Sequence, residues 1–291
     1  MRLAAALALA ALPAAAPAQV SEEVVRFASE GQEVVGTLRL PEGEPAPVVL
    51  LLHGFTGSRD EMAIPGTDEG VFSRAARLLA EEGYASLRID FRGSGESTAD
   101  LSFADTTFER QVADALAAIE HLRSLDTVQA DEMHLIGWSQ GGLVATAAAG
   151  RSGAFDAVAL WAAVAEPEAT YGGFLGAETV EAGMAAGPDE TVAVPLPWGG
   201  EIELKGAFFD GITAFDPQAE IAAWEGPLFV AHGSEDTVVP PSAADRLLAA
   251  HEGPEELWTA EMDHAFDVTE TTETLDAMVG ATVAFFEEHD D

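Results

Sequence analysis

The sequence contains no cysteine among its 291 residues. Disulfide bonds, thiol catalysis and thiolate ligands for a metal are therefore excluded. An exported protein can use disulfides, but a chain of this length buries a full hydrophobic core without them. The length fits one large α/β domain or two small ones.

Basic residues are scarce, with 13 Lys and Arg against 51 Asp and Glu and a formal net charge of −38; Lys205 is the only lysine. Binding to phosphates needs clusters of Lys and Arg, so we expect no nucleic-acid partner. Anionic membrane surfaces should repel the chain as well. Such a surface is typical of proteins that work in salt, where counterions screen self-repulsion; a compositional bias without functional meaning is the alternative.

Long apolar runs are confined to the N-terminus. Arg2 precedes the apolar run at residues 3–12, and Ala16-Pro17-Ala18 has the small-x-small pattern that precedes a cleavage site. We predict a signal peptide at residues 1–18 and a mature chain at 19–291, exported to the periplasm or the medium. A membrane anchor is the alternative, but the run is too short to span a bilayer. No later segment has eighteen consecutive apolar residues, so we expect no stable membrane insertion after cleavage.

A second feature is the motif Gly-Trp-Ser-Gln-Gly at residues 137–141, which fits the pattern G-x-S-x-G. It follows a predicted buried strand at 132–136 and precedes a predicted helix of small residues at 142–149. In this setting a serine, here Ser139, is held on a sharp turn with its hydroxyl exposed as a nucleophile. The flanking glycines are expected because a Cβ there would collide where helix and strand approach closely.

Apolar periodicity indicates an α/β fold. After an opening group of strands, strands alternate with helices, which predicts a mostly parallel sheet covered by helices on both faces. The predicted strands are 24–27, 34–40, 48–53, 85–90, 132–136, 157–161, 228–232 and 256–260. The predicted helices are 72–82, 108–122, 142–149, 242–251 and 272–287.

One connection is too long for this rhythm. Residues 162–225 should join the strand at 157–161 to the strand at 228–232, yet they number more than sixty. Loops of that length usually have a function or a structure of their own. We therefore predict an inserted cap over the site at residues 162–225.

A serine hydroxyl needs a base to take its proton and an acid to orient that base. On this type of sheet the order along the chain is Ser, then Asp or Glu, then His. Asp236 follows the strand at 228–232 and His264 follows the strand at 256–260, so both lie at the strand ends where such sheets build their sites. The other candidates have weaker positions and are interpreted as structural or solvated: His121, His134, His251, His289, Asp263 and Asp267.

The negative oxygen that forms on an attacked carbonyl needs hydrogen-bond donors. The backbone N–H of Gln140, next after the serine, is one predicted donor. The other is expected from the loop after the third strand, where we choose the N–H of Phe55. His53 in the same loop is interpreted as a brace for it and not as a base.

Five motifs occur in order along the chain, at residues 53–57, 90–97, 137–142, 232–239 and 263–264. In these motifs the sequence resembles the α/β-hydrolases, and more narrowly the cinnamoyl or feruloyl esterases and related acyl-ester hydrolases. The resemblance covers nearly all of the mature chain and implies a small-molecule ester as substrate. It implies no metal and no organic cofactor.

By the same resemblance, the insert would form a small cap that shapes the acyl pocket. In relatives that cleave hydroxycinnamates, a cap tyrosine helps to bind the phenol. The comparable place here is Phe208-Phe209, which has no hydroxyl and so favours a more apolar aryl or alkyl acyl group. Trp198, Phe208 and Phe209 are the predicted pocket residues.

The sequence thus predicts an exported serine carboxylesterase that acts on small to medium acyl esters through an acyl-enzyme intermediate. A monoacylglycerol lipase, a thioesterase and a peptidase of the same fold stay open as alternatives. No propeller or other large extra domain is evident, which counts against an oligopeptidase. A non-catalytic binding protein is disfavoured because all three catalytic candidates are present.

Overall fold

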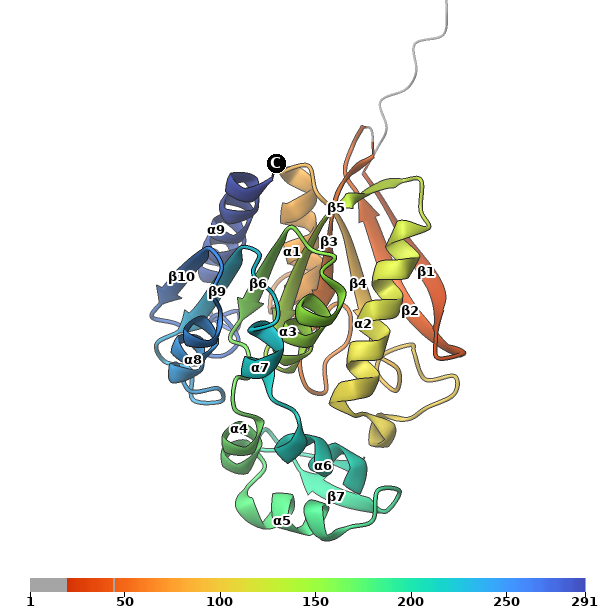
Figure 1. Cartoon of the computed structure of the whole chain (residues 1–291), viewed down its shortest axis with the longest axis vertical. Coiled ribbons are helices and arrows are strands. Elements are labelled where there is room, and N and C mark those ends of the chain that lie inside the picture. Colours follow the sequence, from red (N-terminus) through yellow and green to blue (C-terminus); the bar gives the residue numbers. More distant parts are fainter. Residues whose placement is uncertain (1–19, 44, 291) are drawn as a thin grey trace, which may run out of the picture.

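The computed structural model describes residues 20–43 and 45–290. The predicted signal peptide at residues 1–18 lies outside the described residues. Figure 1 shows a central twisted sheet with helices on either side and a smaller group of elements beyond one edge of it. Within the described ranges, no helix combines the length and apolar character required to cross a membrane.

The central sheet has eight strands in the order β1-β2-β4-β3-β5-β6-β9-β10. β1 pairs antiparallel with β2, and β2 pairs antiparallel with β4. All other neighbours in this order pair parallel. The bounds of the strands are β1 Ser21–Ser29, β2 Gln32–Leu40, β3 Ala46–Leu52, β4 Ala85–Asp90, β5 Val128–Trp138, β6 Ala157–Trp161, β9 Leu228–Gly233 and β10 Glu255–Ala260.

Helices cover both faces of the sheet, as the continuous apolar strands predict. In β3, Val48 and Leu50 face one core with helices α2, α3 and α8, whereas Val49 and Leu51 face a second core with α1 and α9. Figure 1 shows α2 and α3 in front of the sheet. The bounds of these helices are α1 Val71–Glu81, α2 Phe108–Arg123, α3 Gln140–Ser152, α8 Ser242–Ala250 and α9 Glu273–His289.

The register of the parallel strands brings their carboxyl ends to one edge. Leu52 at the end of β3 pairs with Gly137 of β5, and Trp138 of β5 pairs with Trp161 of β6. The chain therefore leaves β3, β5 and β6 at neighbouring points, so loops far apart in sequence can share one site there.

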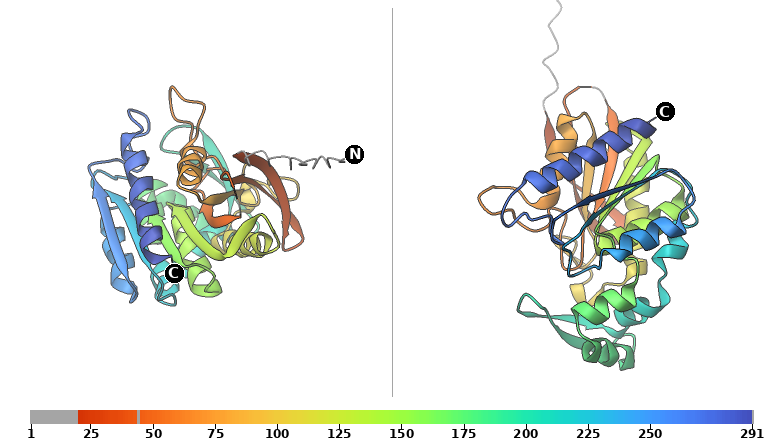
Figure 2. Two further views of the ribbon diagram at one scale, coloured as in Figure 1. Left: turned by 90° about the horizontal axis from the view of Figure 1, so that it is seen from above. Right: turned by 90° about the vertical axis from the view of Figure 1, so that its left-hand side faces the viewer.

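The predicted insert at residues 162–225 contains six elements of its own. Five of them form the group beyond the sheet edge in Figures 1 and 2, which we call the cap (residues 167–214). The sixth, α7 Pro217–Ile221, packs against α3 and α8 and returns the chain to the sheet. The cap consists of α4 Pro167–Phe174, α5 Ala177–Ala185, the hairpin strands β7 Thr191–Pro195 and β8 Glu201–Lys205, and α6 Gly206–Ala214. A short helical turn, η1 Phe103–Asp105, contacts β8 from the core side.

Candidate active site

Ser139 lies on a strained turn between β5 and α3. Its backbone has φ 56° and ψ −116°, a conformation that residues with a side chain rarely adopt. Its N–H donates to the carbonyl of Trp161 at 2.9 Å, and its own carbonyl accepts from the N–H groups of Gly142, Leu143 and Val164 at 3.0 to 3.2 Å. These bonds hold the serine at the tip of the turn.

The glycines around Ser139 are required by close packing, as the sequence analysis expects. A Cβ on Gly141 would overlap the carbonyl oxygen of Leu52, and one on Gly142 would overlap the side chain of Ala163. A Cβ on Gly137 would overlap the carbonyl of Gly141 itself. The helix that follows the serine therefore approaches β3 and β5 more closely than any other residue type would allow.

The structure brings Ser139, His264 and Asp236 together from three separate loops. Nε2 of His264 lies 3.0 Å from Oγ of Ser139, and Nδ1 of His264 lies 2.7 Å from Oδ2 of Asp236. Oδ1 of Asp236 accepts the N–H groups of Val238 and Val239 at 2.8 and 2.9 Å. The imidazole is thus fixed with one nitrogen toward the carboxylate and the other toward the hydroxyl.

Asp236 is buried and ionised. Burial by itself raises its pKa, but contacts from His232 and His264 and the N–H of Val239 outweigh it and hold the pKa well below the ordinary value. His232, whose Nε2 lies 3.4 Å from Oδ2, was not among the sequence candidates. The sequence feature that could have identified His232 is its position near the end of β9, four residues before Asp236.

Asp263 and Asp267 shape the turn that carries His264. Oδ1 of Asp263 accepts the N–H groups of Ala265 and Asp267 at 2.8 and 3.0 Å, and Oδ1 of Asp267 accepts the N–H of Asp263 at 3.0 Å. The carbonyl of His264 also accepts the indole N–H of Trp138 at 3.2 Å. Neither carboxylate contacts the imidazole, which is bound to Asp236.

The loop after β3 forms a tight turn beside Ser139. The N–H of Gly57 donates to the carbonyl of Gly54 at 3.1 Å, and Thr56 has φ 61°. Phe55 is the second residue of this turn, and Gln140 is the first residue of α3. In the described part of the chain, neither the Phe55 nor the Gln140 N–H has a hydrogen-bond acceptor, which leaves both free for a substrate oxygen.

His53 braces this turn from behind. Its Nδ1–H donates to the carbonyl of Gly54 at 2.8 Å, and its Nε2 accepts the N–H of Phe91 at 3.2 Å. Burial lowers the pKa of His53, which keeps the ring neutral and suits it to one donated and one accepted bond. Both ring nitrogens are occupied, so His53 is not available as a base.

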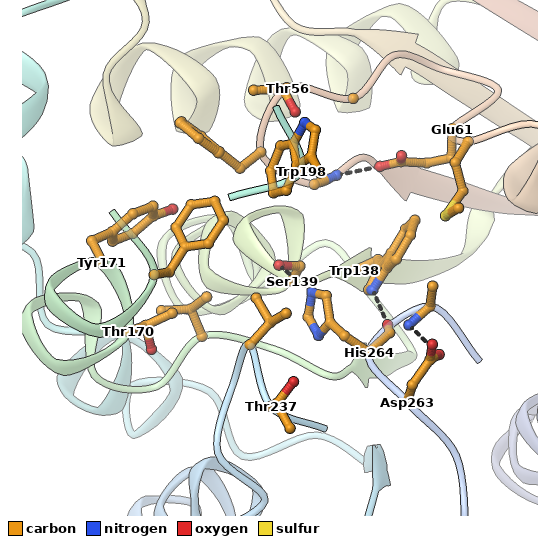
Figure 3. Close-up of a pocket in the computed structure, with 18 of the residues that line it drawn as sticks. Thr56, Glu61, Trp138, Ser139, Thr170, Tyr171, Trp198, Thr237, Asp263 and His264 are labelled. Carbon is orange, nitrogen blue, oxygen red and sulfur yellow. Dashed lines mark hydrogen bonds between the residues drawn. The ribbon is translucent and has the colours of Figure 1, made fainter. Parts of the chain in front are cut away.

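A cavity of about 610 Å³ opens above Ser139, between the sheet edge and the cap. Figure 3 shows Ser139 and His264 at its floor, with Tyr171, Thr170 and Trp198 from the cap around it. This volume is in the range of about 300 to 1,000 Å³ that is usual for small-molecule sites. Among the described residues that line it, none is Lys or Arg, and the acidic ones are Glu61 and Asp263.

The prolyl oligopeptidase family model matches residues 71–264, a range that includes Ser139, Asp236 and His264. The chain belongs to this family. No curated protein matches it.

Solved structures with the same fold include esterases and a peptidase. Est1E from Butyrivibrio proteoclasticus with ferulic acid bound has a TM-score of 0.74 at 23% identity, over 91% of this chain and 98% of that one. The esterase domain of a Rhodothermus marinus protein has a TM-score of 0.68 at 24% identity, over 92% and 99%. The acylaminoacyl peptidase of Pyrococcus horikoshii has a TM-score of 0.67 at 20% identity, over 92% of this chain but 41% of the peptidase. The α/β-hydrolase fold predicted from the motifs is confirmed.

The pocket of this prolyl oligopeptidase family member differs from the sequence prediction in two side chains. Trp198 lines the cavity, but Phe208 and Phe209 do not, and that prediction was wrong. Both are fully buried: Phe208 packs against Phe108 of α2, between cap and core, and Phe209 packs against Gly183 within the cap. Phe208 thus fills the space between α6 and the core and Phe209 the space between α6 and α5, and the letters Phe-Phe do not reveal which space each ring fills.

Tyr171 is the cap tyrosine that sequence reasoning missed. It lines the cavity from α4, and its hydroxyl donates to Oε1 of Gln140. Nε2 of Gln140 in turn donates to Gln111 at 2.7 Å, whose amide donates to Thr106 at 3.3 Å. Burial raises the pKa of Tyr171 well above its ordinary value, so the hydroxyl keeps its proton. A chain of buried hydrogen bonds thus joins the cap to the residue that follows the serine.

Proposed function

We propose that this chain is a serine carboxylesterase that hydrolyses small to medium, uncharged acyl esters. The observation that carries the proposal is the hydrogen-bonded series Ser139, His264 and Asp236 at the floor of a cavity with mainly apolar walls. Nucleophile, base and orienting acid are the three groups that acyl transfer requires, and they occur in one contact series.

In the proposed reaction, Oγ of Ser139 attacks the ester carbonyl while its proton passes to Nε2 of His264. The N–H groups of Phe55 and Gln140 stabilise the resulting oxyanion. The tetrahedral intermediate collapses when His264 gives the proton to the leaving alcohol, which leaves an acyl group on Ser139. Water then attacks that acyl group with His264 as base, and the acid is released. Asp236 holds the imidazole and stabilises its charged form throughout.

The walls of the cavity support an aryl or alkyl acyl group. Phe55, Phe174 and Trp198 offer aromatic faces, and no Lys or Arg among the described lining residues would pair with a substrate carboxylate. Est1E holds ferulic acid in the same fold, so cinnamoyl esters are reasonable candidates here. The Tyr171 hydroxyl already donates to Gln140, which favours acyl groups without a phenol.

A panel of p-nitrophenyl esters from acetate to palmitate, together with methyl ferulate, tests the proposal. We expect turnover of the wild type with an optimum at short or medium chains, and a loss of at least about 10⁴-fold in kcat for Ser139→Ala. Turnover that persists in the variant would exclude Ser139 as the nucleophile. A wild type inactive on every ester would exclude the carboxylesterase.

Peptide hydrolysis is the second candidate, because the family model and the Pyrococcus horikoshii peptidase both point to it. The same three residues would act on an amide, with His264 protonating an amine instead of an alcohol. N-acetyl amino acid p-nitroanilides distinguish an esterase from a peptidase. A peptidase should show turnover of the anilide that is lost in Ser139→Ala, whereas an esterase should cleave the matching p-nitrophenyl ester and leave the anilide intact.

We also propose that the chain is exported, with cleavage after Ala18 of the apolar N-terminal run. The test is expression of the full-length chain in a bacterium, followed by fractionation and N-terminal sequencing. Mature protein that begins at Gln19 outside the cytoplasm is expected. Uncleaved chain in the cytoplasm would overturn export.

A further inference from the structure

Glu61 places a carboxyl group at the turn that carries Phe55, and the mechanism above does not use it. It belongs to the loop between β3 and α1 and lines the same cavity as Ser139. Its Oε1 accepts the N–H of Gly54 at 2.5 Å, the contact drawn at the right of Figure 3. The side chain is partly buried, and the backbone has φ 61°.

The carboxyl group fills the inside of the turn formed by residues 54–57. A Cβ built on Gly57 would lie 2.6 Å from Oε1 and 2.8 Å from Oε2 of Glu61, so a side chain at position 57 would displace the carboxyl group. A Cβ on Gly54 would lie 3.4 Å from Oε1 and 3.4 Å from Cβ of Ser139. Glu61, the turn and the nucleophile are therefore in one continuous packing arrangement.

The backbone of Glu61 is held in an unfavourable conformation to bring this about. A positive φ is costly for a residue with a side chain and persists only where surrounding contacts impose it. Here the N–H of Glu61 donates to the carbonyl of Ser58 at 2.9 Å, and α1 begins against the same loop through the bond from the Phe72 N–H to the Asp60 carbonyl at 3.1 Å. Strain of this kind, next to a nucleophile, indicates a functional demand on the side chain.

We propose that Glu61 is a positioning residue for the oxyanion turn, and that it acts as a neutral carboxylic acid. By accepting the Gly54 N–H, it fixes the His53–Gly54 peptide, one unit before the peptide that carries the Phe55 N–H, and so helps to aim the Phe55 N–H at the carbonyl oxygen above Ser139. This inference rests on the proposed function, because it assigns Glu61 a part in the same acyl transfer.

The surroundings of Glu61 favour the neutral form. On its own loop, Arg59 is paired with Asp90 and Glu96, Asp60 with Arg88 and Glu69 with Arg74, while Asp68 is exposed to solvent. The titratable groups that share its cavity are Asp263, His264 and Tyr171, and His53 lies behind the turn. Burial raises the pKa of Glu61 to about 8, although the N–H groups of Gly54 and Met62 act in the opposite direction.

A neutral acid suits the chemistry of the turn. In the proposed neutral form, Oε1, which accepts the Gly54 N–H, is the carbonyl oxygen of the acid, and Oε2 carries the proton. An ionised Glu61 would place a negative charge beside the oxyanion that forms during acyl transfer and would raise the energy of that state. The kcat of the wild type should therefore fall as the pH rises through about 8.

The test compares Glu61→Ala and Glu61→Gln over pH 6 to 10, on the best p-nitrophenyl ester. Glutamine keeps an oxygen that accepts the Gly54 N–H but cannot ionise, whereas alanine removes the acceptor. Asp68→Asn is the matched control, because it removes one exposed negative charge from the same loop.

For Glu61→Ala we expect a loss of about 10- to 100-fold in kcat at pH 7, with KM within about threefold, since one oxyanion donor contributes about 10²- to 10³-fold. Glu61→Gln should stay within about threefold of the wild type at pH 7 and should lose the fall in kcat above pH 8. Asp68→Asn should follow the wild type at every pH. Circular dichroism and thermal melts show that each variant is folded.

A second readout does not require ester turnover. A fluorophosphonate labels Ser139 while its phosphoryl oxygen occupies the oxyanion site, and mass spectrometry gives the rate. The labelling rate should fall in Glu61→Ala as kcat does and recover in Glu61→Gln. Labelling that depends on Glu61 in a chain without ester turnover would overturn the esterase and keep the positioning role.

Three results would overturn the positioning role. They are a folded Glu61→Ala with wild-type kcat and labelling rate, a folded Glu61→Gln as impaired as the alanine variant, and a Glu61→Gln that keeps the alkaline fall. A folded wild type that the fluorophosphonate does not label at Ser139 would overturn both proposals together.

Discussion

The sheet edge and the cap form opposite walls of one cavity, but they are held by different interactions. Around Ser139 the contacts involve the backbone, where glycines allow α3 to touch β3 and β5. The cap meets the core through a cluster of aromatic rings around Phe55, with centroids 5.6 to 5.7 Å from those of Phe103, Tyr171, Phe174 and Phe208. Backbone contacts fix the reacting atoms, whereas the cap is held by contacts between side chains. We therefore expect substitutions in the core to affect every ester and substitutions in the cap to affect some esters more than others.

The largest effect should come from the core, in Asp236→Asn. The uncharged amide cannot stabilise a charged imidazole, and its NH2 can donate to Nδ1 and so select the wrong tautomer of His264; kcat should therefore fall about 10⁴-fold for every ester. Asp245→Asn on the exposed side of α8 is the control for a lost charge. If the loss of kcat in Asp236→Asn differs among acyl chains, the core residues also select the substrate, which would contradict the division of roles between core and cap.

Gly141→Ala should test the close packing of the core. The new Cβ overlaps a backbone oxygen of β3 that cannot rotate away, so the free energy of unfolding should fall by about 3 kcal/mol in urea titrations. Gly280→Ala in α9 meets open space and should instead stabilise the chain by about 1 kcal/mol. Equal changes in the free energy of unfolding for Gly141→Ala and Gly280→Ala would contradict the close packing at Gly141.

Tyr171→Phe breaks the one hydrogen bond that links the cap to Gln140. The buried amide oxygen of Gln140 loses its donor, which should cost about 1 to 3 kcal/mol of stability and about tenfold in kcat. Tyr84→Phe removes the only other tyrosine hydroxyl, which donates to Asp290 far from the site. If kcat is unchanged in Tyr171→Phe, as in Tyr84→Phe, the hydrogen bond from the cap does not affect Gln140 as an oxyanion donor.

Trp198→Ala tests whether the cap contributes to the selection of the acyl group. The indole is 60% exposed and packs on Phe174 with ring centroids 5.4 Å apart. Its loss should raise KM several-fold for long or aryl esters and leave the acetate unchanged. A uniform fall in kcat across the ester panel would assign Trp198 to the chemistry and not to substrate selection.

The smallest expected effect is on stability against pH. The pKa of Glu61 is raised from its ordinary 4.5 to about 8 in the folded chain, so the folded state holds this proton more tightly than the unfolded state does. Its contribution to stability is full below pH 4.5 and is lost as the pH rises toward 8. Glu61→Gln should therefore gain a few degrees in Tm relative to the wild type between pH 5 and pH 9. A constant difference in Tm would contradict the raised pKa.

Element prediction succeeded where a pattern is local and continuous. The strands at 85–90 and 157–161 have the predicted ends, because each is a short apolar run buried on both faces. β5 begins at Val128 instead of residue 132, because Val128 and Gln129 already pair with β3; the register then shifts, and the acidic residues Asp131 and Glu132 in this irregular stretch interrupt the apolar pattern. The hairpin of β7 and β8 was not predicted, because a short exposed pair of strands has little apolar periodicity.

The sequence alone was enough to predict the order of the sheet strands and of the helices that cover them, the fold, and the contact of His264 with Ser139 and Asp236. These depend on local spacing and on the rule that parallel strands end at one edge, which a linear pattern can express. Tertiary structure alone decided that Phe208 and Phe209 turn inward, that Tyr171 binds Gln140, and that Glu61 lies inside the oxyanion turn. Such contacts join residues far apart in the chain through shape and burial, and no local pattern specifies which side chain fills a given space.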